Sequence, residues 1–449
     1  MSGPVQIGAA TLHLGDVREV LRSLPDESVH CCVTSPPYWG LRSYLQEGDP
    51  KKALELGSER TPEEFVAHMV EVFREVRRVL RPDGGLWLNL GDCYATGAGK
   101  VGACPGGGEQ GTRWAGQHPS RGESTRGLRN GRHTGKHTAM TAIGPMTQAN
   151  RLPVPGLKPK DLVMIPARVA MALQADGWWL RSQCPWVKRN PMPDSTTDRP
   201  GSGVEYMFLL SKSAHYFYDT EAVKVPAVAD HPACNKNGYQ RAERISGSLG
   251  SGAKVVEHYD KRNRRNNDWF FESWQGLYSE APTDPLAFVV NPSGFADAHF
   301  ATFPPKLVEP CILAGTSEHG CCPACGAPWE REVERTFKPQ GDVAEEASMG
   351  FCSSAPRMPL ANGWQGTPRG TTSTRTLGWR ATCDCPAAAP VPCAVLDPFG
   401  GAGTTALVAE RLGRRSVSIE LNPEYLAMQE RRLRVATAQG SLFAPRRAL

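Results

Sequence analysis

The sequence contains no apolar run approaching the ~20 residues needed to span a membrane, and its N-terminus lacks the basic-then-apolar plan of a secretory signal peptide. These absences predict a cytoplasmic protein. An excess of one charge is also missing, because 51 Lys and Arg residues face 46 Asp and Glu residues, giving a formal net charge of +5. The distribution of charge along the chain therefore matters more for polyanion binding than its sum does.

Residue types that favour loops and metal binding are plentiful. The chain has 46 Gly, 38 Pro and 14 Cys among 449 residues, so irregular segments are expected between folded ones. A chain of this length usually forms about two to four domains. In a cytoplasmic protein, this many cysteines indicates free thiols and a metal site rather than a disulfide framework.

Strands and amphipathic helices alternate in the first hundred residues. Strand-like runs at 6–16, 29–33 and 86–92 flank two helical patterns, at 17–24 and 61–81. The second helix opens with Thr-Pro-Glu-Glu, which supplies an N-cap, a proline in the first turn and a capping-box glutamate. This alternation predicts an α/β fold, a mostly parallel sheet with helices on both faces.

The same kind of pattern resumes after residue 157. We expect a helix over 160–177, a strand over 178–188 and a hairpin-like pair of strands at 205–212 and 216–219.

The strand-like run at 29–33 ends in Thr34-Ser35-Pro36-Pro37-Tyr38. Neither proline can donate a backbone hydrogen bond, and Pro37 keeps Pro36 out of the helical region, so the strand must stop at a rigid corner. The Ser35 hydroxyl and the neighbouring carbonyls remain as acceptors, with the flat ring of Tyr38 beside them. This combination suits a planar group that carries an NH2, although an ordinary proline turn has the same pattern.

A second motif lies near the C-terminus, where a strand-like run reaches Asp397 and a glycine turn leads into a helix. A further strand ends in Glu420, which is placed to accept hydrogen bonds from ribose hydroxyls. Glycines let the backbone approach a ligand at a helix N-terminus. The turn departs from GxGxxG, and Asp397 would repel a pyrophosphate but attract an ammonium group. The motif therefore favours S-adenosylmethionine over a dinucleotide.

Four cysteines have the spacing of a structural zinc site. Cys322 and Cys325 form a knuckle with two residues between them, and Cys383 and Cys385 can complete the site. Cys321 competes with Cys322 for the first position. A redox pair is the alternative, but no thioredoxin-like context surrounds it.

Two segments lack regular apolar periodicity. Residues 95–156 are rich in Gly, Thr and Arg and are predicted to be a flexible insertion. Residues 221–285 include the basic run 261–267, followed by Trp269 and two phenylalanines. Basic residues beside aromatics suit nucleic-acid binding, and a solvated face is the plainer alternative.

Taken together, the motifs resemble those of the amino-methylating (N4-cytosine/N6-adenine) site-specific DNA methyltransferases, in the permuted β-type group whose catalytic motif precedes the cofactor motif. Residues 34–38 are similar to the S/D-P-P-Y catalytic motif, and 396–405 to the D-P-F-x-G-x-G-T-T cofactor motif. Residues 298–307 resemble a cofactor-lining segment, and Gly15-Asp16 the acidic strand end that meets the adenine. The resemblance implies a Rossmann-like S-adenosylmethionine-dependent methyltransferase fold.

The resemblance also implies roles for these residues. Ser35 and the Pro36 carbonyl would accept hydrogen bonds from the amino group of a base flipped out of the duplex, while Tyr38 stacks on that base. Asp397 would hold the ammonium of the cofactor and Asp16 its adenine amine. The remaining predicted site residues are Pro37 in the catalytic motif and Pro398, Phe399, Gly401, Gly403, Thr404, Glu420 and Phe303 around the cofactor.

The predicted organisation divides the methyltransferase core among several segments. Along the chain, the predicted segments are 1–94 (catalytic half), 95–156 (insertion), 157–220 (core), 221–285 (target recognition), 286–319 (cofactor-pocket lining), 320–390 (zinc-ribbon-like insertion), 391–435 (cofactor half) and 436–449 (tail).

Serine at the first motif position favours cytosine-N4 as the target, with adenine-N6 as the alternative and a non-catalytic zinc-ribbon DNA-binding protein as a further one. Double-stranded DNA is the expected partner, without a membrane. A cognate restriction endonuclease and the choice between monomer and homodimer are left open.

Overall fold

We describe a computed structural model of the chain, which has two compact units. The described residues are 3–41, 44–45, 48–95, 156–158, 160–188, 198–199, 203–226, 258–259, 261–262, 288–289, 304–339 and 370–443. The larger unit comprises residues 1–218, 265–328 and 385–449, and the smaller unit comprises 219–264 and 329–384.

The larger unit is built on a nine-stranded sheet with the order β1-β2-β14-β13-β3-β4-β6-β5-β10. The strands from β2 to β4 in this order are parallel, β1 and β6 run antiparallel to their neighbours, and β10 is parallel to β5. The bounds are β1 Val5–Ile7, β2 Ala10–Leu14, β3 Val29–Thr34, β4 Leu80–Leu90, β5 Trp179–Val187, β6 Val204–Ser211, β10 Phe288–Val289, β13 Ala394–Asp397 and β14 Arg415–Glu420.

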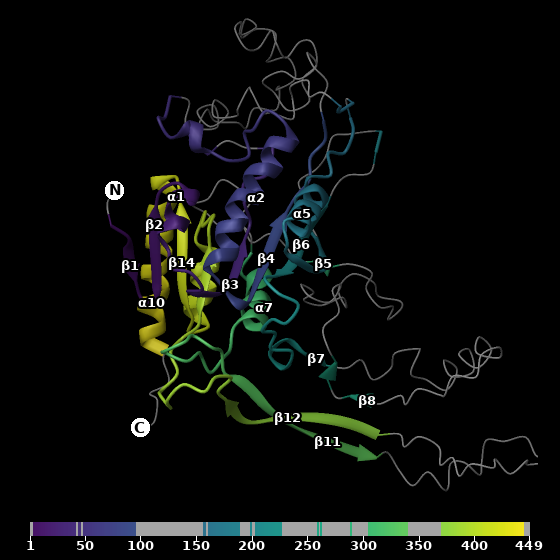
Figure 1. The fold of residues 1–449 in the computed structure, drawn as a ribbon, viewed down its shortest axis with the longest axis vertical. Helices are drawn as coiled ribbons and strands as arrows, with labels where there is room; N and C mark the ends of the chain where they lie inside the picture. Colours follow the sequence, from purple (N-terminus) through teal and green to yellow (C-terminus); the bar gives the residue numbers. More distant parts are fainter. Residues whose placement is uncertain are drawn as a thin grey trace, which may run out of the picture. The chain divides into compact units, whose positions relative to one another are not determined.

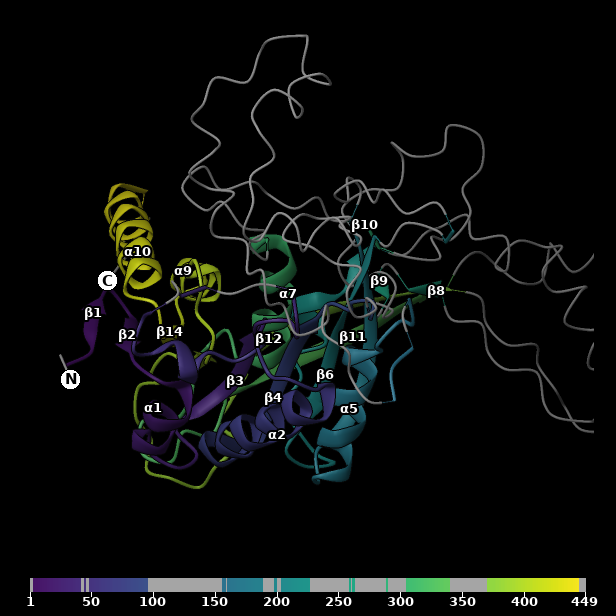
Figure 2. The ribbon, with the colours of Figure 1, turned by 90° about the horizontal axis from the view of Figure 1, so that it is seen from above.

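Helices cover both faces of this sheet (Figures 1 and 2). Figure 2 shows α1, α2 and α5 on one face and α7, α9 and α10 on the other. Their bounds are α1 Val17–Ser23, α2 Pro62–Val79, α5 Ile165–Ala175, α7 Pro305–Gly315, α9 Thr404–Arg411 and α10 Pro423–Phe443, with a short 3-10 helix at Lys52–Leu54. The predicted α/β architecture, a mostly parallel sheet with helices on both faces, is confirmed.

The core lies between the helices and the central strands, because these strands are buried on both faces. All six residues of β3 and all four of β13 are buried. Helix α2 packs its apolar stripe, including Phe65, Met69 and Phe73, into this core. Its predicted capping box is confirmed, since the Thr61 side chain accepts from the Glu64 N–H and the Glu64 side chain accepts from the Thr61 N–H.

Two predicted strand arrangements are wrong. The strand predicted over 6–16 is a hairpin, because Gly8 takes a left-handed conformation (φ +57°) and turns β1 back against β2. The predicted pairing of 205–212 with 216–219 is replaced by pairing of β6 with β4 on one side and with β5 on the other. Strand β6 thereby lies next to β4, which is the first strand after Pro36-Pro37 in the chain.

The smaller unit is a β-ribbon. Strands β11 (Glu330–Pro339) and β12 (Gly370–Arg380) pair antiparallel with one register shift, and β8 (His258–Tyr259) adds to β12 in parallel. A short pair joins β7 (Val225–Pro226) to β9 (Lys261–Arg262), after a 3-10 turn at Glu221–Val223. Within this unit, Asp219 binds Arg331, whose guanidinium stacks on Trp379.

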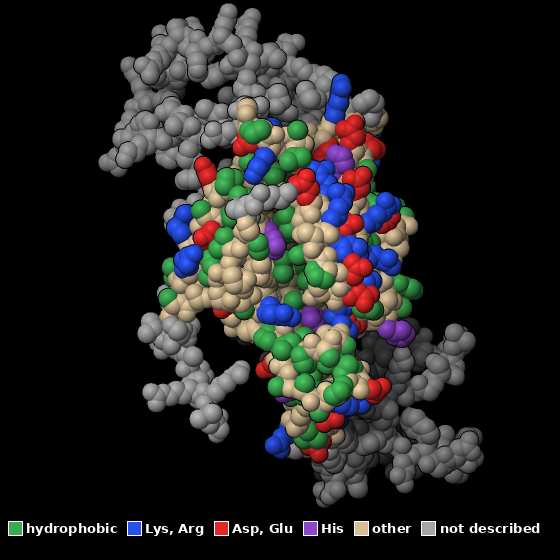
Figure 3. Space-filling view, turned by 60° about the vertical axis from the view of Figure 1, so that its left-hand side comes forward, with side chains coloured by type: hydrophobic (Ala, Val, Ile, Leu, Met, Phe, Trp, Pro, Cys, Tyr) green, Lys and Arg blue, Asp and Glu red, His purple; other side chains and the backbone are tan. Residues whose placement is uncertain are grey.

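On the surface that Figure 3 shows, Lys and Arg side chains are interspersed with Asp and Glu side chains. Nearly all of the predicted insertion at 95–156, and most of the basic segment at 221–285, lie outside the described residues, so their roles in DNA binding stay predictions. Among the helices that the structure describes, none is long and apolar enough to cross a membrane.

Candidate active site

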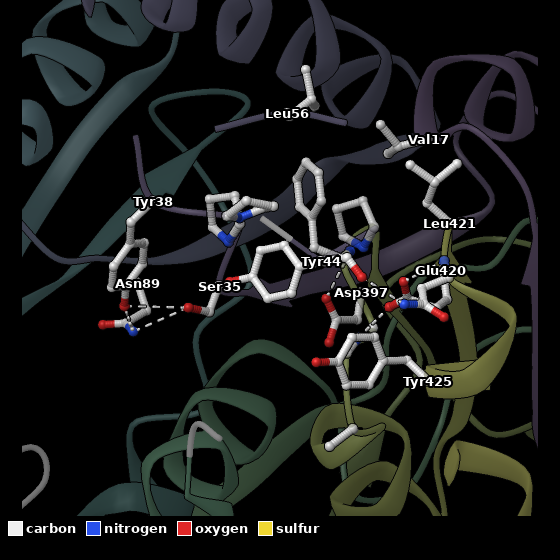
Figure 4. Close-up of a pocket in the computed structure, with 18 of the residues that line it drawn as sticks. Val17, Ser35, Tyr38, Tyr44, Leu56, Asn89, Asp397, Glu420, Leu421 and Tyr425 are labelled. Carbon is white, nitrogen blue, oxygen red and sulfur yellow. Dashed lines mark hydrogen bonds between the residues drawn. The ribbon is translucent and has the colours of Figure 1, made fainter. Parts of the chain in front are cut away.

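A cavity of about 430 Å³ opens in the larger unit at the carboxyl ends of the parallel strands (Figure 4). Ligands bind at this edge in open α/β sheets. Residues from the ends of β2, β3, β13 and β14 line the cavity, together with the start of β6. Two sequence motifs more than 350 residues apart therefore face the same space.

A hydrogen bond ties the catalytic motif to the cofactor motif. The Thr34 hydroxyl donates to Asp397 Oδ1 at 2.7 Å, and the Phe399 N–H donates to the same oxygen at 3.1 Å. Adjacent parallel pairing of β3 and β13 brings these residues together. Thr34, the residue before Ser35, thereby fixes the carboxylate of the cofactor motif.

Two carboxyl groups in the cavity, the buried Asp397 and the half-buried Glu420, have raised pKa values. Burial raises the pKa of Asp397 to about 6, against the opposing hydrogen bonds from Thr34 and Phe399. Burial also raises the pKa of Glu420 to about 7, and the nearby charge of Asp397 adds to the shift. In the described part of the chain, neither carboxylate forms an ion pair with Lys or Arg, so a bound cation would relieve the cost of ionising them.

Glu420 also organises the glycine turn. Its Oε2 accepts from the Gly401 N–H and its Oε1 from the Asn422 N–H, both at 2.8 Å. Gly401 and Gly403 have positive φ values of 51° and 74°, a conformation that favours glycine. Gly403 caps the N-terminus of α9. The approach of this backbone to a ligand stays a prediction.

Asp16 lies at the end of β2 and is engaged by the protein itself. It caps α1 by accepting from the Arg18 N–H, and its carboxylate also forms two hydrogen bonds with the Arg18 guanidinium. Burial opposes the charged form, but the contacts with Arg18 outweigh it and lower the pKa of Asp16. Its predicted contact with adenine stays a prediction.

Tyr38 is held by polar residues that the sequence reading missed. Its hydroxyl donates to Glu205 Oε2 at 2.7 Å and accepts from Asn89 Nδ2 at 2.8 Å. The same Asn89 nitrogen lies 3.3 Å from Ser35 Oγ, and Lys188 pairs with Glu205. A polar Asn within the apolar strand run 86–90 is the signal that could have revealed this group.

The opposite end of the cavity is aromatic and apolar. The rings of Tyr44 and Tyr425 meet edge to face with centroids 6.2 Å apart. Figure 4 shows Val17 and Leu421 on the same side of the cavity as Glu420, and Leu56 also lines the cavity. One end of the cavity thus presents acceptors and Tyr38, and the other presents carboxylates and apolar surface.

Most of the predicted site residues meet in this cavity. Those that line it are Asp16, Ser35, Pro36, Pro37, Tyr38, Asp397, Pro398, Phe399, Gly401, Thr404 and Glu420. Gly403 does not line it but caps the adjoining helix. Phe303 lies outside the described residues.

Three of the predicted zinc ligands lie together in the larger unit. The sulfur atoms of Cys322, Cys325 and Cys385 are all within 4.8 Å of one another, close to the spacing of about 3.8 Å between thiolates of a tetrahedral site with bonds of about 2.3 Å. Cys383 is assigned to the smaller unit, so the four-cysteine site stays a prediction. None of the described cysteines forms a disulfide.

Cys321 belongs to a separate group, with His30 and Cys393. The His30 ring connects this region to the sheet, because its Nδ1 accepts from the Ala394 N–H and its Nε2 donates to the Gly326 carbonyl. The choice of Cys322 over Cys321 as a zinc ligand stays a prediction.

Comparison with known proteins decides the family. A family model described as DNA methylase (N6_N4_Mtase) matches residues 29–322 and 393–431, which include both motifs and most of the sheet. The chain belongs to this DNA methylase family. The match agrees with the resemblance in the sequence motifs.

Three curated relatives align over nearly the whole chain. The Type II methyltransferase M.Cfr9I of Citrobacter freundii is 33% identical over 433 residues, covering 96% of this chain and 90% of the relative. M.XycI of Xanthomonas campestris pv. cyanopsidis is 33% identical over 430 residues, covering 96% and 89%, and M.SmaI of Serratia marcescens is 30% identical over 420 residues, covering 94% and 89%.

A solved structure of PvuII DNA methyltransferase (cytosine-N4-specific) aligns with a TM-score of 0.44 at 15% identity, covering 100% of this chain and 92% of that one. A TM-score of this size supports no inference about the present chain.

Proposed function

We propose that this DNA methylase transfers a methyl group from S-adenosylmethionine to the exocyclic amino group of a flipped base in double-stranded DNA, with cytosine-N4 as the target. The observation that carries the proposal is the single cavity in which Ser35 and Tyr38 face Asp397 and Glu420. A non-catalytic DNA-binding protein would need neither the buried carboxylates nor the cavity.

The cavity suits S-adenosylmethionine, which supplies a methyl carbon activated by a sulfonium centre. Asp397 is a buried carboxylate and Glu420 a half-buried one, neither has a cationic partner among the described residues, and the methionine ammonium is a matching cation. Phe399 and the apolar end of the cavity can cover the adenine ring. We assign Asp397 to the ammonium, Glu420 to the ribose hydroxyls and Asp16 to the adenine edge.

The Ser35 end of the cavity suits the target base. Ser35 Oγ and the Pro36 carbonyl can each accept a hydrogen of the amino group, which holds the nitrogen lone pair toward the methyl donor. The Tyr38 ring supplies a stacking surface for the base. As the new N–C bond forms, the C–S bond would break with its electron pair staying on sulfur, and the amine would pass one proton to solvent. Most of the rate enhancement then comes from positioning and electrostatics.

Cytosine is preferred because serine occupies the first position of the catalytic motif; adenine-N6 is the competing outcome. Structural zinc at the four cysteines completes the proposal, with Cys322, Cys325 and Cys385 as ligands from the larger unit and Cys383 as the fourth. Zinc there would stabilise the turn after α7 and take no part in methyl transfer.

The test is transfer of a labelled methyl group from S-adenosylmethionine to duplex DNA by the purified full-length protein. We expect label in DNA, none in an equal amount of RNA or bulk protein, and loss of labelling in Ser35→Ala. Binding of S-adenosylmethionine without transfer to any duplex would contradict the proposal.

A further inference from the structure

The Glu205 carboxylate joins two side chains in the wall of the cavity. Its Oε2 accepts from the Tyr38 hydroxyl at 2.7 Å, and its Oε1 pairs with the Lys188 ammonium. The Glu205 side chain is 13% exposed and that of Lys188 is 20% exposed. Neither residue belongs to the motifs that resemble the catalytic or cofactor signatures.

Sheet register explains why Asn89 meets the same group. Asn89 on β4 lies directly opposite Met207 on β6, and Glu205 is two residues before Met207. Side chains two apart on a strand share a face, so Asn89 and Glu205 are diagonal neighbours across the two strands. Asn89 Nδ2 lies 2.8 Å from Tyr38 Oη and 3.2 Å from Glu205 Oε2.

The donors and acceptors in this group have one consistent assignment. An ionised Glu205 can only accept, so the Tyr38 hydroxyl must donate to it. The oxygen of Tyr38 then accepts from the Asn89 amide nitrogen. The Asn89 amide is oriented favourably, because its nitrogen, rather than its oxygen, faces the Glu205 carboxylate. With its hydrogen and a lone pair both used, the Tyr38 hydroxyl is fixed in position.

The ring of Tyr38 is also fixed by packing. A Cβ placed on Gly91 would lie 2.5 Å from Tyr38 Cε2 and 2.9 Å from Cδ2, so the ring lies directly against the glycine backbone. The Gly91 backbone limits the ring beside its Cδ2 and Cε2 atoms, and Glu205 and Asn89 hold its hydroxyl end. These contacts together hold the ring at one angle to the cavity.

We propose that Glu205 and Asn89 are positioning residues for methyl transfer, which act by holding the Tyr38 ring in the plane that stacks on the target base. This inference rests on the proposed function. A reacting amine and methyl carbon must align closely, and a small rotation of the stacking ring moves the base out of line. Lys188 balances the Glu205 charge, since an unpaired carboxylate in a mostly buried site is costly.

A double-mutant cycle tests the route through the Tyr38 hydroxyl. Glu205→Gln is made with Tyr38 present and again with Tyr38→Phe, which removes the hydroxyl and keeps the ring. Single-turnover methyl transfer to duplex DNA and the Kd of S-adenosylmethionine are measured for all four proteins. The contact with Lys188 changes equally in both backgrounds, so it cancels from the comparison.

We expect Glu205→Gln to slow transfer about tenfold when Tyr38 is present and less than about twofold in the Tyr38→Phe background. The Kd of S-adenosylmethionine should change by less than about twofold in every variant. Equal slowing in both backgrounds would show that Glu205 acts independently of Tyr38. A rise in that Kd matching the loss of rate would show a damaged cofactor site, which also overturns the proposal.

The controls separate this inference from the proposed function. Asp176→Asn removes a surface ion pair with Arg74 and should leave transfer unchanged. If Glu205→Gln does not fold, Glu205→Asp keeps the charge beside Lys188 and enters the same cycle. A wild-type protein that transfers no methyl group to DNA refutes the proposed function, and the inference falls with it; a methylating wild-type enzyme without coupling refutes the inference alone.

Discussion

Ser35 directly follows β3, and the proposed choice of the target base rests on this residue. Its hydroxyl lies 3.3 Å from Asn89 Nδ2 and 3.4 Å from the Tyr38 hydroxyl, within the cavity. We predict that Ser35→Ala lowers single-turnover methyl transfer by about 100-fold, because one preorganised contact to the reacting group is lost. Binding of S-adenosylmethionine, measured by calorimetry, should be unchanged.

Ser28→Ala is the matched control, because the Ser28 hydroxyl donates to the exposed Pro25 carbonyl and lies outside the cavity lining. A wild-type rate of methyl transfer in Ser35→Ala would show that Ser35 takes no part in the reaction.

The buried carboxyls predict a pH dependence of stability. Burial raises the pKa of Asp397 from 3.8 to about 6, so the folded protein holds this proton at pH values where the unfolded chain has released it. The free energy of unfolding of the cofactor-free protein should therefore fall as pH rises from about 4 to about 7, with about 3 kcal/mol from Asp397. Glu420, with its pKa raised to about 7, acts in the same direction.

Urea unfolding across this pH range measures the effect. Asp397→Asn cannot ionise, so its stability should fall less with rising pH than that of the wild type. The same pH dependence of the free energy of unfolding in the two proteins would contradict the raised pKa of Asp397. S-adenosylmethionine should stabilise the wild type more at high pH, where the carboxylates are charged.

At the scale of elements, Gly91, the residue directly after β4, supports Tyr38. Gly91→Ala would place a methyl group 2.5 Å from the Tyr38 ring, whereas a Cβ at Gly85 within β4 meets nothing closer than 3.7 Å. We predict that Gly91→Ala slows methyl transfer about tenfold or more, with intact binding of S-adenosylmethionine. Gly85→Ala should remain close to wild type in the same assay. Equal rates of methyl transfer in both variants would show that the position of the Tyr38 ring does not affect catalysis.

The turn at 322–326, which carries Cys322 and Cys325, is connected to the sheet by side chains of β3 and β4. His30 on β3 donates to the Gly326 carbonyl at 2.9 Å, and Arg81 on β4 donates to the Cys325 carbonyl. Metal at the turn should therefore support the central strands as well as the turn itself.

Elemental analysis should find about one zinc per chain. A chelator, or Cys325→Ser, should lower the melting temperature, while Cys184→Ser serves as a control because Cys184 lies in neither cysteine group. A metal-free protein with an unchanged melting temperature would show that these cysteines are simply free thiols.

The elements differ in how far the sequence could predict them. Helix α2 and the strand before the proline corner carry strong local signals, in the Thr61 capping box and in Pro36-Pro37. The partner of β6 could not be predicted, because pairing with β4 joins residues more than 100 positions apart and depends on the folded sheet. The split of the first strand depends on one left-handed glycine, Gly8.

At the scale of the whole molecule, the cavity is assembled from distant parts of the chain. The motifs at 34–38 and 396–405 were predicted to share a site, and parallel pairing of β3 with β13 brings them together. Asn89, Glu205 and Lys188 were missed because each is a single polar residue whose partners are defined only by the sheet. The predicted role of 221–285 in target recognition rests on its basic and aromatic residues and stays a prediction.

The most direct test of this account is sequencing of DNA, with detection of modified bases, after expression of the protein in a host that lacks DNA methylation. We predict N4-methylcytosine at every occurrence of one short sequence, and the loss of this modified base with Ser35→Ala. N6-methyladenine at a defined sequence would contradict the choice of base. Unmodified DNA in cells that contain the folded, cofactor-binding protein would contradict the function itself.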